Sequence, residues 1–155
     1  MKAQIQNSLF QVSEIKVSYQ PNFKASERPQ ISSSKNAYDI LIASWDMDTI
    51  QMTESFKILI LNRSNRIIGI KEISSGGLAG TVADPKIIFA IALKCLGSAI
   101  ICCHNHPSSN LKPSQQDISI TKRLVEAGKI LDLQVLDHLI ISNEGYYSFG
   151  DEGLI

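Results

Sequence analysis

The chain has 155 residues, which is enough for one domain with a hydrophobic core. Apolar residues make up 44% of it and charged residues 19%, as in an ordinary soluble domain, and fifteen basic side chains balance fifteen acidic ones. A balanced chain has no overall field that would draw it to nucleic acid or to an anionic membrane, although a local basic patch is compatible with this balance.

The apolar segments and the cysteines predict a cytoplasmic protein with no membrane partner. Residues 1–7 are polar and lack the apolar segment of a signal peptide. No apolar run approaches the ~20 residues that a membrane span needs. The three cysteines, Cys95, Cys102 and Cys103, are an odd number that suits a reducing compartment, and none has the CxxC spacing of a thiolate zinc knuckle.

The first part of the chain, residues 1–32, is expected to hold a strand and a connecting loop. In residues 8–19 apolar and polar side chains alternate, which indicates a strand with one irregularity. The apolar positions are Phe10, Val12, Ile15, Val17 and Tyr19. Prolines and serines in residues 20–34 indicate the loop.

A single domain is predicted for residues 33–155. It is expected to open with a helix that Ser33 or Ser34 caps and that ends near Ser44. Two apolar runs then flank residues 62–65, Asn-Arg-Ser-Asn, which predicts a hairpin.

The next elements alternate between helix and strand. Asp84 and Pro85 are a favourable helix start, and the helix to about Leu96 is apolar nearly all round, so we expect it to be buried. Residues 98–103 predict a short buried strand, and residues 114–131 a second long helix. Its expected inner face consists of Ile118, Thr121, Leu124, Val125, Gly128 and Leu131.

Two strands are predicted at the end of the chain, residues 133–142 and 146–149, joined by a turn at residues 143–145. The order of elements therefore predicts an α/β protein in which helices flank one mixed sheet.

Residues 104–117, HNHPSSNLKPSQQD, carry the clearest functional signal. His104 and His106 are two positions apart, so in an extended segment both rings project to the same side. Two neutral imidazoles and one carboxylate are usual ligands of a catalytic zinc. The spacing of Ser114 and Asp117 is also that of a capping box at a helix start, and both interpretations can hold together because the helix would aim Asp117.

The segment HNHPSSNLKPSQQDISITKRL, with LDHLIIS and GYYSF downstream and LNRSNRIIG upstream, resembles the RadC-like branch of the JAB/MPN domains, also called JAMM metalloproteases. The resemblance covers roughly residues 33–150. It implies a three-layer, cytidine-deaminase-like α/β fold with a mixed sheet flanked by helices, and one Zn²⁺ at the sheet edge. It also implies roles: His104, His106 and Asp117 as metal ligands, Ser114 as a helper, and an upstream glutamate as acid and base.

The chemistry of amide hydrolysis asks for the same residue types. A carboxylate must take a proton from water and pass it to the leaving amine. Glu54, directly before an apolar run, matches the family position, and Glu72 is the alternative. A hydroxyl donor would stabilise the oxyanion; Ser114 has the right spacing, although we expect that it could not cap the helix fully and donate at once.

Four further features have modest interpretations. His138 is expected to be a core histidine paired with a neighbour, with a supporting role behind a metal ligand as the alternative. Cys103 should point away from His104 and serve packing. Asn105 is expected to hold the histidine loop through backbone hydrogen bonds, and residues 74–80 form either a rim beside the site or a surface loop.

The leading functional hypothesis is a zinc-dependent hydrolase of peptide or isopeptide bonds acting on a protein or peptide. The alternative, from the resemblance, is a DNA-repair-associated accessory protein acting near nucleic acid, which the balanced charge does not favour. A metal-free scaffold is disfavoured because all three ligands are present. The contiguous His-Asn-His is unlike the dispersed residues of HNH nucleases, and the zinc deaminase signature is missing from the sequence. The oligomeric state is left open.

Overall fold

Residues 12–76 and 82–155 are described here in a computed structural model. Five strands form one mixed sheet in the order β2-β1-β3-β4-β5. Their bounds are β1 Ser55–Leu61, β2 Ile67–Ser75, β3 Ala99–Asn105, β4 Gln134–Ser142 and β5 Gly145–Ser148. β3 and β4 pair in parallel, and the other neighbours pair antiparallel.

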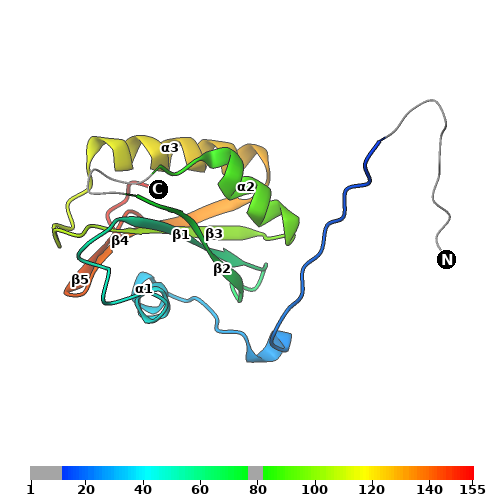
Figure 1. Ribbon diagram of the computed structural model, residues 1–155, viewed down its shortest axis with the longest axis horizontal. Coiled ribbons are helices and arrows are strands. Elements are labelled where there is room, and N and C mark those ends of the chain that lie inside the picture. The colour runs from blue at the N-terminus through cyan, green and yellow to red at the C-terminus, as the bar shows by residue number, and fades with distance from the viewer. Residues whose placement is uncertain (1–11, 77–81) are drawn as a thin grey trace.

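Helices cover both faces of the sheet, which gives three layers (Figure 1). Helix α1, Ser34–Ala43, lies on one face, and α2, Pro85–Lys94, and α3, Gln115–Ile130, lie on the other. A short 3₁₀ helix, Ala25–Glu27, precedes them. The predicted α/β class, with a mixed sheet flanked by helices, is confirmed.

The alternation of side chains along the strands builds a separate core on each face. Toward α1, Leu59, Ile101 and Leu139 pack with Leu41. Toward α2 and α3, the alternate residues of the same strands pack with residues of both helices. These alternate residues include Phe56, Ile58, Ile100 and Cys102. Cys103 faces α1, so it points away from His104, as predicted.

Local sequence signals account for the starts of α1 and α2. Ser33 accepts a hydrogen bond from Asn36 N at the start of α1, and Asp84 accepts one from Lys86 N before Pro85 at the start of α2. Such caps contribute about 1 kcal/mol each. Between β1 and β2, Asn62 Oδ1 accepts from two backbone N–H groups of the turn, which confirms the predicted hairpin.

The predicted N-terminal strand is wrong in its described part. Residues 12–20 form no strand, and Val12 and Ile15 are each 87% exposed. An alternating pattern forms a strand only where another strand accepts its hydrogen bonds, and this segment runs away from the sheet (Figure 1). Phe10, the remaining apolar position of that pattern, lies outside the described residues.

Two helix predictions also need correction. Helix α2 buries only one side, since Ile87 is 47% exposed and Leu93 41% exposed, because it is the outer layer above the sheet. The second long helix ends before Leu131, which is exposed, and Leu133 takes the core position instead. Residues 77–80 of the predicted glycine-rich rim lie outside the described residues.

Candidate metal centre

His104 and His106 reach the site from the end of β3. This strand is buried along its whole length because it lies between β1 and β4. His104 is the penultimate residue of β3 and is 2% exposed. It stacks on Phe56, its register partner in β1, with ring centroids 6.1 Å apart. The rings of His104 and His106 lie side by side, 4.8 Å between centroids, as the two-residue spacing predicted.

The start of α3 brings Asp117 to the same place. Ser114 is the N-cap, and its Oγ accepts a hydrogen bond from Asp117 N at 3.1 Å. Asp117 Oδ2 in turn accepts one from Ser114 N at 2.6 Å. The capping box is therefore present, and the same carboxylate faces the histidines, so the two interpretations of Ser114-x-x-Asp117 hold together.

Two imidazole nitrogens and the two oxygens of one carboxylate converge at spacings that suit a metal ion. His104 Nε2 lies 3.0 Å from His106 Nε2 and 3.2 Å from Asp117 Oδ1. His106 Nε2 lies 3.5 Å from Asp117 Oδ2. A tetrahedral zinc with bonds of about 2.0–2.1 Å holds its ligand atoms roughly 3.3 Å apart. The donor set and its spacing therefore fit a single divalent cation.

The charges of the group support this interpretation. Burial opposes ionisation of the Asp117 carboxyl, but its contacts with the His104 and His106 rings outweigh it and hold its pKa well below the ordinary 3.8. The hydrogen bond to Asp117 raises the pKa of His106 above 6.5, although burial lowers it, and the Asn110 carbonyl raises it further. The group thus attracts a cation, either a proton or a metal ion, into the space between its donors.

Each of the two imidazole rings also makes a hydrogen bond through Nδ1, the ring nitrogen that does not face the candidate metal centre. His106 Nδ1 hydrogen bonds to the carbonyl oxygen of Asn110 in its own loop. His104 Nδ1 lies 2.8 Å from His138 Nε2 on β4. Orientation of a ligating histidine through its second nitrogen is usual in metal sites.

His138 is fully buried and belongs to a longer chain of contacts. Its Nδ1 lies 2.6 Å from Thr121 Oγ1 on α3, and that hydroxyl donates to Asp117 O at 2.6 Å. Burial holds the pKa of His138 well below 6.5. The prediction of a core histidine paired with a neighbour is confirmed, and one of its neighbours is His104.

Of the two candidate glutamates, Glu54 lies near the group. Its negative charge is one of the causes that raise the pKa of His106. Glu72 on β2 pairs with Lys57 of β1, and Lys57 points to the α1 face, where its ammonium group contacts the end of that helix. Paired residues of antiparallel strands share a face, so Glu72 lies on the other side of the sheet from His104.

Asn105 holds the segment that carries Glu54, not the histidine loop as we expected. Its Nδ2 donates to Ile50 O at 2.7 Å and to Thr53 O at 2.9 Å, and its Oδ1 accepts from Ser55 N at 2.7 Å. The reason for the difference is strand alternation, which turns Asn105 away from the two rings and toward the loop before β1.

Ser114 can do more than we expected from the sequence. Its Oγ acts as an acceptor in the cap, and a hydroxyl keeps its own proton when a lone pair is used. Capping and donation by Ser114 are therefore compatible, and its use as a donor to a substrate stays a prediction.

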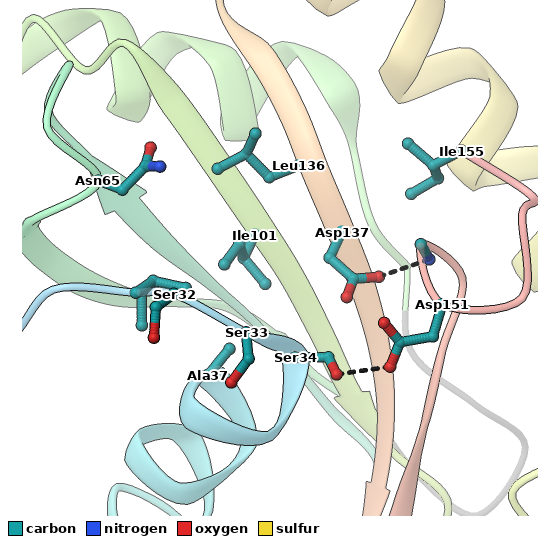
Figure 2. A pocket seen from close by; sticks show the side chains of 12 residues that line it. Ser32, Ser33, Ser34, Ala37, Asn65, Ile101, Leu136, Asp137, Asp151 and Ile155 are labelled. Carbon is teal, nitrogen blue, oxygen red and sulfur yellow. Dashed lines mark hydrogen bonds between the residues drawn. The ribbon is translucent and has the colours of Figure 1, made fainter.

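The described part of the chain has a surface pocket of about 440 Å³ on the other face of the sheet (Figure 2). Ser34, Asp137 and Asp151 line it, and Ser34 Oγ donates to Asp151 Oδ2. Asp137 accepts hydrogen bonds from Ser148 Oγ and Gly150 N. Because these polar groups already bind one another, we assign the pocket a structural role.

The two buried cysteines of β3 are not part of the metal centre. Burial raises the pKa of Cys102 to about 12, and it raises the pKa of Cys103 as well, so both remain protonated thiols. Neither cysteine belongs to the group of described side chains that could hold a metal ion.

Two supporting residues escaped the sequence analysis. Thr121 was assigned only to the inner face of its helix, and Asn110 received no role. Thr121 lies four residues after Asp117, and that helical spacing is the one signal that could have linked it to the ligand. Asn110 acts through its backbone carbonyl, which no side-chain motif reveals.

Among the described residues, no helix is long and apolar enough to cross a membrane. The chain matches the RadC-like JAB domain over residues 31–154. It is 45% identical over 125 residues to a UPF0758 protein of Flavobacterium johnsoniae, covering 81% of this chain and 53% of the relative. It is 41% identical over 136 residues to a UPF0758 protein of Porphyromonas gingivalis, covering 87% and 59%. The chain spans about half the length of the curated relatives it matches. On these grounds, and with the mixed sheet and the His-His-Asp group in place, the chain belongs to the RadC-like JAB domain family.

Proposed function

We propose that the protein is a zinc-dependent hydrolase of peptide or isopeptide bonds in which His104, His106 and Asp117 hold one Zn²⁺. The convergence of the two imidazole nitrogens and the Asp117 carboxylate, with closest N–N and N–O distances of 3.0 to 3.5 Å, carries the proposal. Membership of a JAB-domain family adds to it. When bound, zinc would supply a water of lowered pKa and polarise the scissile carbonyl.

Glu54 is proposed to move the proton. Amide hydrolysis needs a base that takes a proton from the attacking water and then protonates the leaving amine. Glu54 is close enough to influence His106 electrostatically and is only partly buried, so it can exchange protons with a bound substrate. Ser114 is proposed to donate a hydrogen bond from its hydroxyl group to the developing oxyanion.

The substrate is proposed to be a protein or peptide. His104 is the inner ligand, while the side chains of His106 and Asp117 are 16% and 14% exposed, so the group opens to solvent on their side. A peptide bond and an isopeptide bond at a lysine side chain present the same amide to such a group. A screen for activity should therefore include both.

The metal assignment is tested by metal analysis of the purified protein. We expect about one zinc per chain, and we expect His104→Ala and Asp117→Ala to lose most of it because three protein ligands are needed to hold the ion. Lys112→Ala, in the same loop but outside the group, is the matched control and should keep its zinc. Full zinc content in both ligand variants would refute the assignment.

The acid and base are tested by a screen of peptide and isopeptide cleavage. Glu54→Gln should retain zinc and lose about 100-fold or more of the rate, a usual contribution of general acid–base catalysis. Glu72→Gln is the control and should cleave normally. A zinc-loaded wild-type protein that cleaves no amide, together with salt-sensitive DNA binding by the metal-free protein, would favour the nucleic-acid-associated alternative.

A further inference from the structure

We infer that His138 and Thr121 are positioning residues that fix the tautomer of His104, with the proton on Nδ1 and the Nε2 lone pair directed at the metal centre. The inference rests on the proposed function in one respect, namely that His104 is a ligand. Its structural content is a chain of three hydrogen bonds from Asp117 O through Thr121 and His138 to His104.

The donor and acceptor of each hydrogen bond in this series are fixed because its first member is a carbonyl oxygen. Thr121 Oγ1 lies 2.6 Å from Asp117 O. A carbonyl oxygen only accepts, so the single hydroxyl proton of Thr121 has to be donated there. The Thr121 oxygen is also 2.6 Å from His138 Nδ1, and toward that nitrogen it can act only as an acceptor. His138 therefore has its proton on Nδ1.

The position of the proton on His138 determines the position of the proton on His104. Its ring is fully buried between Phe56 and Phe149, with centroids 5.5 Å and 5.0 Å away, and hydrogen bonds to no carboxylate. Such a ring carries one proton, so its Nε2 is an acceptor. His104 Nδ1, at 2.8 Å, must then be the donor.

The result is a His104 ring prepared for a metal ion. With its proton on Nδ1, the Nε2 lone pair faces His106 Nε2 and Asp117 Oδ1. The opposite direction would place a proton on Nε2, and this proton would have to leave before a metal could bind. His106 obtains the same tautomer from a backbone carbonyl, whereas His104 depends on two side chains from other elements.

A pair of variants at Thr121 tests the inference. Thr121→Val keeps the shape and removes the hydroxyl, so His138 loses the acceptor for Nδ1 and should move its proton to Nε2. His104 should then carry its proton on Nε2, and zinc affinity should fall about 10- to 100-fold, the usual effect of losing such a support. Thr121→Ser keeps the hydroxyl and should match the wild type in the tautomer of His104 and in zinc affinity.

The measurements are the ring nitrogen shifts of the histidines in the metal-free proteins at one pH near 8, and zinc affinity by chelator competition. Wild-type His104 protonated on Nε2 would overturn the inference, even if Thr121→Val failed to fold. Equal zinc affinity in Thr121→Val and Thr121→Ser would also overturn it. A wild type that shows the inferred tautomers but binds no zinc would leave the hydrogen-bond chain standing and refute the proposed function alone.

Discussion

At the scale of single residues, Asn105 links the metal centre to the proposed base. It lies between the two histidines in sequence, and its three hydrogen bonds secure the backbone on both sides of Glu54. The side chain is completely buried. Asn105 therefore fixes the position of Glu54 relative to the rings of His104 and His106, which precede and follow Asn105 in the sequence.

We predict that Asn105→Ala destabilises the protein and slows hydrolysis more than it lowers zinc content. Each buried group left without a partner costs about 1–3 kcal/mol, and this change leaves Ile50 O, Thr53 O and Ser55 N in that position. Urea unfolding measures the stability, and the cleavage rate is compared with the zinc content from metal analysis. Asn105→Asp is a second test variant: it keeps the shape and the acceptor for Ser55 N but loses both Nδ2 donations, so it should also be destabilised. An unchanged unfolding midpoint in both variants would contradict this account.

At the scale of elements, the candidate metal centre connects the end of β3 to the start of α3 through the interaction between the His106 ring and the Asp117 carboxylate. Asp117 has a lowered pKa, so its contribution to stability is present above 3.8 and is lost as the pH falls through its lower folded value. His106 has a raised pKa, so its contribution is present below 6.5 and is lost as the pH rises through its folded value. Both contributions to stability are therefore fully present between pH 3.8 and pH 6.5.

We therefore predict that this pair stabilises the metal-free protein most between pH 3.8 and 6.5, and that its contribution declines above that window. Urea unfolding in the presence of a chelator, across that range and up to pH 9, measures it. His106→Gln should lack the decline above pH 6.5. With zinc present the trend should reverse, because a ligand has to lose its proton before it binds the metal.

The elements around the site could be predicted from sequence because their signals are local. Ser33, Asp84 and the Ser114 capping box mark helix starts, and the two-residue spacing places both histidine rings on one side. The support behind His104 could not be predicted in this way. His138 lies 34 residues from His104 and 17 from Thr121, so only the parallel pairing of β3 and β4 and the packing of α3 bring the three together.

At the scale of the whole molecule, the N-terminal segment is separate from the three-layer domain. Residues 12–20 form no strand, although the alternation of Val12, Ile15 and Val17 predicts one. One described contact of this segment with the sheet is the hydrogen bond from the Tyr19 hydroxyl to Ile68 O, at 2.8 Å. An alternating pattern shows that one face of a strand would be apolar and the other polar. It does not supply the neighbouring strand with which a strand has to pair.

We predict that removing residues 1–18 changes the free energy of unfolding by less than about 0.5 kcal/mol, as for other exposed surface changes. The described part of that segment buries little apolar surface, since Val17 is also 65% exposed. Urea unfolding of the shortened and full chains measures the difference. Ile31→Ala, at a core position that is 9% exposed, should cost about 2 kcal/mol and shows that the assay detects a loss of packing. A shortened chain that unfolds as early as this variant would contradict the prediction.

The three proposed ligands and both side chains behind His104 come from one continuous stretch, residues 104–138, whereas Glu54 comes from the loop before β1. The proposed metal ligands and the proposed acid and base therefore come from different parts of the chain. Under the proposed function, a relative altered only at position 54 would keep the three metal ligands and lose the acid and base. Bound metal in such a relative would then not by itself indicate an active enzyme.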